Sequence, residues 1–273
     1  MGGGGFSMEP DNPLLDRYVL GLAAKDNPRV CFVPPSGDAQ GYVERFYAAF
    51  ARLPCAPSHL SLYNPPTADL RTLVFAQDII YVGGGNTRSM LALWREWGFD
   101  RVVRAFWEAG GILAGLSAGS ICWFEQGVTD SIPGALTPLP CLGLLPGSNC
   151  PHYDSEPERR PAYHRLVAEG RIADGYACDD GVALHFVGER LARVVSARPS
   201  ARAYRMERTA DGATETPSRR SIWARATGRG RLGVVDRRQL TSRGAGRYSS
   251  PCSRRQARAA RSGLRQIQAE RAR

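Results

Sequence analysis

The sequence predicts an α/β protein built on a doubly wound, mostly parallel sheet with helices on both faces. Two observations predict this class. Over residues 1–215, short apolar runs alternate with longer amphipathic segments, and apolar residues within the runs are consecutive. Continuous apolar runs are typical of strands buried on both faces, as parallel strands linked by helices are. A hydrophobic content of 43% is sufficient for the core of such a domain.

The predicted elements follow one another in β-then-α order. Arg29–Val33 is an apolar run that stops at two prolines, and the apolar residues of Asp38–Leu53 fall on one helical face. Later strands are predicted at apolar runs bounded by turn-forming residues, namely Ser58–Tyr63, Asp78–Val82, Ile112–Gly115, Gly181–Val187, Ala192–Ser196 and Ala203–Glu207. Helices are predicted at Thr87–Trp97 and at Phe99–Ala109, which ends at a glycine pair.

Both ends of the chain depart from this pattern. Gly2–Gly5 look like the loop after a first strand, but no strand precedes them, so we expect the domain of residues 1–215 to lack its opening strand. Residues 216–273 are rich in Arg, Ser and Gly, and this composition predicts a disordered or aberrant tail. Sixteen of the 36 Lys and Arg residues and two of the 26 acidic residues lie there, so the tail carries +14 and the preceding part −4.

The composition also limits the protein's location and cofactors. No run of about 18 apolar residues and no basic-then-apolar leader is present, so we expect a cytoplasmic protein without a membrane contact. The seven cysteines are scattered without CxxC spacing, which argues against a disulfide framework and a zinc site. We expect neither a metal nor an organic cofactor.

The stretch Gly115–Gly119 (GLSAG) matches the G-x-S-x-G nucleophile elbow, with a predicted strand before it and a helix after it. In such an elbow a strained turn exposes the serine hydroxyl, and the flanking glycines allow close packing. Ser117 is therefore the predicted nucleophile. The alternative is a tight turn of small residues without a catalytic role.

A serine hydroxyl needs a base within hydrogen-bond reach and an acid that orients the base. Of the four histidines we choose His152 as the base, because it lies in a loop following Leu142–Leu145 and functional side chains are often found in loops on a rigid sheet. Asp130 is the first choice for the acid and Glu156 the second. A solvated loop residue is the alternative for each.

Main-chain N–H groups are expected to stabilise the negative charge on the substrate carbonyl oxygen. Ala118, directly after the serine, is one natural donor. The triple glycine at 83–85 is the second, since glycine lets the main chain approach a substrate closely. A nucleotide-binding loop is a weaker interpretation, because the G-x-G-x-x-G spacing is absent.

Four motifs occur in order along the chain, YVGGGNT, GLSAGS, VTDS and CPHYD. From Gly2 to Glu215 this order resembles the peptidase E (aspartyl dipeptidase) family and its relatives the cyanophycinases, which are serine hydrolases on a fold similar to the class I glutamine amidotransferases. The resemblance implies a triad of Ser117, His152 and Asp130, with the main chain of Gly84 and Gly85 serving the oxyanion. The short spacing from Ser117 to Asp130 departs from the dipeptidase branch. The segments FSMEPDNP and PHYDSEPERRPAY also differ, which leaves the Asp-X preference open.

The sequence therefore predicts a serine peptidase that hydrolyses a dipeptide or another small peptide through an acyl-enzyme on Ser117. Hydrolysis of another amide or ester, as by cyanophycinases, is an alternative. So is a non-catalytic domain with a nucleic-acid-binding tail, although the tail has few aromatic residues and no recognisable motif. A homodimer stays open.

Overall fold

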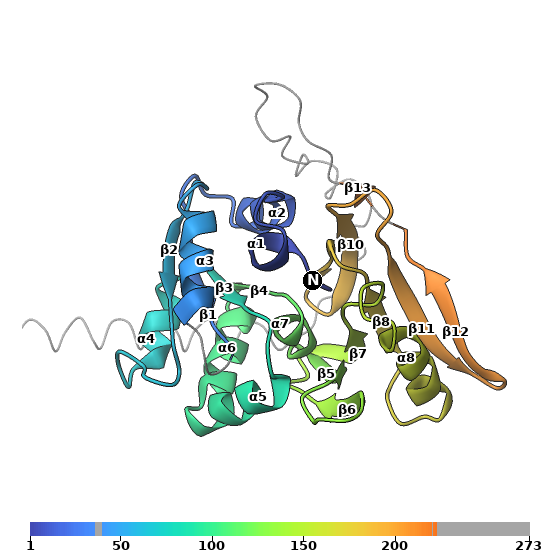
Figure 1. The fold of residues 1–273 in the computed structure, drawn as a ribbon. Coiled ribbons are helices and arrows are strands. Elements are labelled where there is room, and N and C mark those ends of the chain that lie inside the picture. Colours follow the sequence, from blue (N-terminus) through green and yellow to red (C-terminus); the bar gives the residue numbers. More distant parts are fainter. Residues whose placement is uncertain (36–39, 220, 223–273) are drawn as a thin grey trace, which may run out of the picture. The chain divides into compact units, whose positions relative to one another are not determined.

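The computed structural model describes residues 1–35, 40–219 and 221–222, all within one compact unit, Met1–Arg225. Its helices are α1 (Gly5–Met8), α2 (Leu14–Leu22), α3 (Gln40–Phe50), α4 (Leu70–Phe75), α5 (Thr87–Glu96), α6 (Phe99–Glu108), α7 (Ala118–Ile121) and α8 (Arg159–Ala168). Its strands are β1 (Arg29–Val33), β2 (Ala56–His59), β3 (Ile79–Val82), β4 (Ile112–Gly115), β5 (Phe124–Thr129), β6 (Thr137–Pro140), β7 (Leu145–Cys150), β8 (Gly175–Cys178), β9 (Val182–Val187), β10 (Arg190–Ser196), β11 (Ala203–Thr209), β12 (Gly212–Pro217) and β13 (Ser221–Ile222). Figure 1 shows their arrangement.

The first sheet contains four parallel strands in the order β2-β1-β3-β4. Successive residues of β1 alternate between two cores: Val30 and Phe32 belong to one cluster, Cys31 and Val33 to the other. Because side chains point to opposite faces along a strand, an uninterrupted apolar run fills both cores at once.

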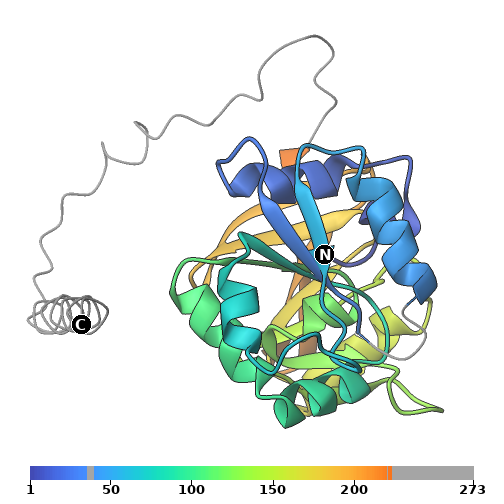
Figure 2. The ribbon, with the colours of Figure 1, turned by 90° about the vertical axis from the view of Figure 1, so that its left-hand side faces the viewer.

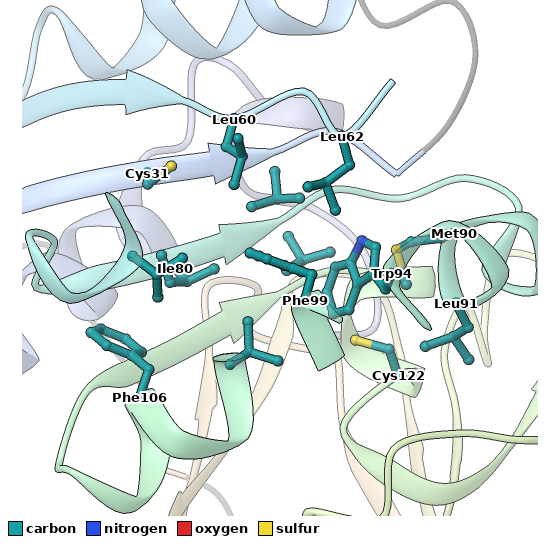
Figure 3. Packing of buried hydrophobic residues seen from close by; sticks show 14 of the residues in the cluster. Cys31, Leu60, Leu62, Ile80, Met90, Leu91, Trp94, Phe99, Phe106 and Cys122 are labelled. Carbon is teal, nitrogen blue, oxygen red and sulfur yellow. The ribbon is translucent and has the colours of Figure 1, made fainter. Parts of the chain in front are cut away.

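On one face the sheet packs against α4, α5 and α6, as Figure 3 shows from close by. Trp94 of α5 and Phe99 of α6 are almost fully buried, with ring centroids 4.8 Å apart in an edge-to-face arrangement. Burying each such side chain contributes roughly 1.5–3 kcal/mol to folding. This cluster also contains Ala118 and Cys122, so the core supports the helix that follows β4.

On the other face lie α1, α2 and α3, seen beside the sheet in Figure 2. Phe6 of α1 is the centre of this packing, since its ring contacts Phe32, Phe46 and Phe50 at centroid distances of 5.4–5.6 Å. Asp16 of α2 is also buried here, and its carboxylate accepts a hydrogen bond from the hydroxyl of Tyr81 at 3.0 Å. Burial raises the pKa of Asp16 to about 6, although hydrogen bonds oppose part of the rise.

The second sheet has six strands in the order β12-β11-β8-β7-β5-β6. Its centre is parallel, because β5 pairs with β7 and β7 with β8 in the same direction, while β6, β11 and β12 are antiparallel additions. A separate antiparallel ribbon of β9 and β10 pairs with β13. The carboxyl ends of β7 and β8 carry the residues of the site described below.

The predicted α/β class with a mostly parallel sheet is confirmed. The predicted bounds of β1 and β4 agree with the structure, those of β3, α5 and α6 agree to within one residue, and β2 lies earlier than expected. Strands β5–β8 and β12 were not predicted. Their sequences carry glycine, proline and polar residues, so they lack a continuous apolar run.

Other expectations stay predictions. The division at residue 215 and the missing opening strand are not tested, and nearly all of the tail of residues 216–273 lies outside the described residues. Among the helices that the structure describes, none has the length and apolar content needed to cross a lipid bilayer.

Candidate active site

A serine lies at the turn between a parallel strand and a helix. β4 ends at Gly115, and Ser117 immediately precedes α7. The φ and ψ angles of Ser117 are 54° and −117°, a conformation that costs residues with side chains on the order of 1–3 kcal/mol. Ser117 is half-buried whereas Leu116 and Ala118 are buried. The strained turn therefore leaves the serine as the accessible residue of the elbow.

The glycines on either side of the serine are required by main-chain packing. A Cβ atom at Gly115 would lie 2.1 Å from the carbonyl oxygen of Gly119, and one at Gly119 would lie 2.3 Å from that of Val82. Both distances are far below van der Waals contact, so only glycine fits at either position. The pentapeptide thus has the geometry that the elbow motif predicts.

A buried histidine is hydrogen-bonded to a buried aspartate near this turn. The Nδ1 atom of His152 lies 2.8 Å from Oδ1 of Asp180, and the two side chains are only 10% and 2% exposed. Burial raises the pKa of Asp180, but hydrogen bonds from the side chains of His152 and Ser155 outweigh this effect and leave the pKa below its usual value. The N–H of Asp180 donates to Oδ1 of Asp154 at 2.8 Å. The carboxylate is therefore ionised and held in place beside the imidazole.

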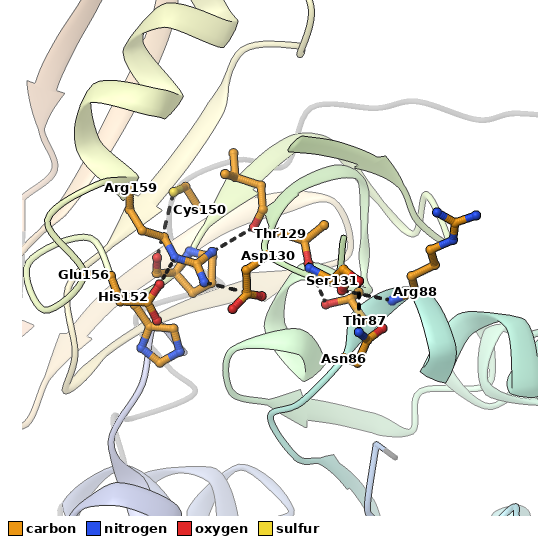
Figure 4. A network of polar contacts seen from close by, with 12 residues as sticks. Asn86, Thr87, Arg88, Thr129, Asp130, Ser131, Cys150, His152, Glu156 and Arg159 are labelled. Carbon is orange, nitrogen blue, oxygen red and sulfur yellow. Dashed lines mark hydrogen bonds and ion pairs between the residues drawn. The ribbon is translucent and has the colours of Figure 1, made fainter. Parts of the chain in front are cut away.

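Asp130, the expected acid, does not contact His152. Its side chain is 68% exposed, and its charged partner is Arg159, at 3.9 Å between Nη2 and Oδ1 (Figure 4). Glu156, the second choice, accepts from Nε of Arg159 at 2.6 Å. Arg159 is almost fully buried and also donates to the carbonyl oxygen of Val128 at 3.0 Å, so it connects the histidine loop to β5.

The position of Asp180 follows from the register of the second sheet. β7 and β8 are parallel neighbours in which Cys150 pairs with Ala177. His152 comes two residues after the end of β7, and Asp180 two residues after the end of β8, so both emerge at the same edge of the sheet. Asp130 directly follows β5, the parallel neighbour of β7 on its other side, but its side chain is exposed to solvent. The structure thus places Asp180, and not Asp130, in contact with the imidazole of His152; the short strand GYAC before Asp179-Asp180 was not among the predicted strands.

Main-chain contacts bring the elbow and the His–Asp pair to one region. The N–H of Ser117 donates to the carbonyl oxygens of Met1 and Gly2, both at 3.2 Å, and Gly3 forms a parallel bridge with Asp180. A Cβ at Gly3 would lie 2.1 Å from Oδ1 of Asp180. Residues 1–3 therefore contact the serine elbow on one side and Asp180 on the other.

A side-chain contact provides a second connection. Ser120, on α7, donates to Oδ1 of Asn149 at 3.1 Å, near the end of β7. Among the described residues no hydrogen bond joins Ser117 Oγ to His152. Such bonds are often long in enzymes without substrate.

Among the described residues, no acceptor contacts the N–H groups of Gly85 and Ala118. Ala118 is the first residue of α7, where an N–H has no partner within the helix. Gly84, also expected to serve the oxyanion, donates its N–H to the hydroxyl of Tyr42 at 3.0 Å. Gly84 nevertheless lies against the serine, since a Cβ there would be 3.1 Å from Ser117 Cβ.

The cysteine thiols near the site are poor alternatives as nucleophiles. Cys122, Cys150 and Cys178 are buried, and burial raises the pKa of both Cys150 and Cys178 to about 12. A thiol with so high a pKa is protonated at neutral pH, and the thiolate is the reactive form.

An α/β fold with a serine elbow and a buried His–Asp pair defines a hydrolytic class of protein. The comparison with protein families agrees and is more specific. Residues 1–194 match Peptidase family S51, so the chain belongs to this family and is a peptidase.

Curated relatives and solved structures carry related names. The chain is 58% identical over 207 residues to "Uncharacterized peptidase YgaJ" of Bacillus subtilis, covering 76% of this chain and 90% of that relative. It is 29% identical over 187 residues to "Peptidase E" of Pasteurella multocida, covering 64% and 77% of the two chains. The crystal structure of a peptidase from an acI-B1 Actinobacterium matches with a TM-score of 0.56 at 16% identity, over 79% of this chain and 92% of that one, and shows similarity of fold. The resemblance to peptidase E is thus confirmed.

Proposed function

We propose that the chain is a serine-type peptidase that hydrolyses a dipeptide or another small peptide through an acyl-enzyme on Ser117. The observation that carries this proposal is the buried pair of His152 and Asp180 at 2.8 Å, which main-chain contacts of residues 1–3 connect to the strained elbow of Ser117. In this arrangement Asp180 replaces Asp130 as the third member of the triad. The name of the Pasteurella multocida relative, peptidase E, supports the choice of substrate class.

The proposed reaction has two halves. Ser117 Oγ attacks the peptide carbonyl carbon while its proton passes to Nε2 of His152, and Asp180 stabilises the imidazolium through Nδ1. The N–H groups of Ala118 and Gly85 bind the oxyanion of the tetrahedral intermediate. Collapse of the intermediate breaks the C–N bond, and His152 returns the proton to the leaving amine. Water then attacks the ester with His152 again as the base, which releases the acid and restores the serine.

Covalent labelling tests the proposal directly. A fluorophosphonate probe should modify the protein, and peptide mapping should place the label on Ser117. Ser117→Ala should abolish both labelling and hydrolysis in a panel of dipeptides. Labelling at a different residue, or hydrolysis by Ser117→Ala at the wild-type rate, would disprove the proposed nucleophile. Acyl esters and isopeptide substrates in the same panel separate a dipeptidase from a cyanophycinase-like hydrolase.

A cytoplasmic location is part of the same proposal. The six described cysteines are all free, as is typical of a reducing compartment. Cell fractionation with an antibody against the protein would test it.

A further inference from the structure

Tyr42 of α3 lies against the glycine turn that follows β3. Its hydroxyl accepts the N–H of Gly84 at 3.0 Å, and a Cβ at Gly83 would lie only 2.8 Å from Cε1 of its ring. The ring packs edge-on against Phe32 and beside Phe6, with centroids 5.1 and 5.7 Å away. Aromatic packing therefore fixes the position from which the hydroxyl reaches the turn.

The hydroxyl is suited to accept a hydrogen bond. Burial raises the pKa of Tyr42, and hydrogen bonds from the Ser7 side chain and the Gly84 N–H offset part of this rise. The group is consequently a neutral phenol at physiological pH. It can accept the amide proton without placing a negative charge beside the oxyanion position.

The other contacts of the turn show what this hydrogen bond adds. The N–H of Gly83 donates to the carbonyl oxygen of Val33 and its own carbonyl accepts from the N–H of Gly119, both at 3.1 Å, so both bonds are to main chain. The N–H of Gly84 is held by a side chain, that of Tyr42. The next N–H, of Gly85, has no acceptor among the described residues and is a proposed oxyanion donor.

We propose that Tyr42 is a positioning residue for catalysis: by binding the Gly84 N–H, its hydroxyl fixes the turn that directs the Gly85 N–H toward the developing oxyanion. The inference rests on the proposed function. Without this bond the Gly84 peptide plane can rotate, and the orientation of the adjoining Gly85 amide changes with it.

Tyr42→Phe tests the role because it keeps the ring and removes the hydroxyl. Losing an oxyanion donor costs about 100- to 1000-fold in kcat, and a misplaced donor should cost less, so we expect kcat to fall about 10- to 30-fold. KM and the affinity for the product acid should stay within about twofold. Affinity for a peptide aldehyde, which forms a tetrahedral adduct, should fall by the same factor as kcat. A merely structural role would not separate these two affinities.

Tyr47→Phe is the matched control. Tyr47 lies on the same helix, and its hydroxyl contacts Nδ1 of His59 at 2.9 Å in an exposed position. This variant should retain kcat and aldehyde affinity within about twofold. Equal kcat in the two variants would overturn the inference, as would a Tyr42→Phe variant that loses aldehyde and product affinity equally.

Two further measurements keep the test decisive. If Tyr42→Phe does not fold, fluorotyrosines introduced at position 42 weaken the hydroxyl as an acceptor while keeping its shape. Falling kcat with increasing fluorination supports the inference, and unchanged kcat overturns it.

Fluorophosphonate labelling of the wild type separates the two proposals. A wild type that is not labelled at Ser117 contradicts the proposed function, whereas a labelled wild type with an unaffected Tyr42→Phe contradicts this inference alone.

Discussion

Replacing Asp180 by Asn tests which carboxylate completes the triad. The change keeps the size of the side chain and removes its charge from a buried site, where the side chain is 2% exposed and lies 2.8 Å from Nδ1 of His152. In the proposed reaction the imidazole becomes positively charged during acylation, and the aspartate stabilises that charge. Coulomb's law with an effective dielectric constant of about 20 gives about 6 kcal/mol at this distance.

Part of this stabilisation is retained in Asp180→Asn, because the asparagine oxygen can still accept a hydrogen bond from Nδ1. We therefore expect a loss of about 4–5.5 kcal/mol, which corresponds to about 10³- to 10⁴-fold in the acylation rate. Asp130→Asn provides the comparison. Its carboxylate is 68% exposed and contacts Arg159 rather than the imidazole, so that variant should acylate within about threefold of wild type.

The assay is the second-order rate of labelling by a small fluorophosphonate, which requires an activated serine but few contacts with a peptide substrate. Circular dichroism and thermal unfolding confirm that each variant is folded. If Asp130→Asn lost the labelling rate and Asp180→Asn kept it within tenfold, the assignment of Asp180 would be wrong and the original choice of Asp130 right. Equal large losses in two folded variants would show that the distance argument does not identify the acid.

Two other predictions concern the packing of the glycine turn and the charge of a buried carboxylate. Gly84→Ala puts a Cβ 3.1 Å from Ser117 Cβ, so kcat should fall about tenfold or more. Gly21→Ala is the control, because a Cβ there has nothing within 4 Å; this variant should keep its activity and gain up to about 1 kcal/mol in stability. Equal effects of the two variants on kcat and on urea unfolding would contradict the packing argument. Asp16 should make the free energy of unfolding fall by about 3 kcal/mol in total as the pH rises from about 3 to about 7, because its pKa is 3.8 unfolded and about 6 folded and the folded state binds the extra proton. Urea unfolding at pH 4.5 and 7.5 should show about 2 kcal/mol of this fall in wild type relative to Asp16→Asn, and parallel pH dependences in the two proteins would count against it.

The first sheet was largely predictable because its strands are buried on both faces. Arg29–Val33 and Ile112–Gly115 were predicted as strands since their consecutive apolar side chains alternate between two cores. The second sheet was not. β5 and β7 contain Gly127, Gly147 and polar side chains such as Ser148, whose hydroxyl is bonded to Tyr163 at 2.7 Å. Tertiary contacts satisfy these residues, and a single sequence does not display such contacts.

The same limit explains which site residues were predicted. Ser117 stands in a local motif whose strand, turn and helix are contiguous, so its placement followed from the sequence. His152 was chosen by its loop. Asp180 required the knowledge that β7 and β8 are adjacent, which depends on pairing between segments about 27 residues apart. Asp130 was ranked first for its position beyond the elbow helix and Glu156 second as a neighbour of the histidine, and the side chains of both contact Arg159 instead of the ring.

Close main-chain approach, more than side-chain contact, determines where this site forms. At four glycines an added Cβ would meet a neighbouring atom at 2.1–3.1 Å. The neighbour is Asp180 for Gly3, Leu116 and Ser117 for Gly84, Gly119 for Gly115, and Val82 for Gly119. The glycines allow the N-terminal segment, the turn after β3 and the elbow to contact one another directly. Because any added side chain separates these segments, the distances around Ser117 depend on residues with no functional group. Substitution at these four positions should therefore impair catalysis even though the triad residues are unchanged.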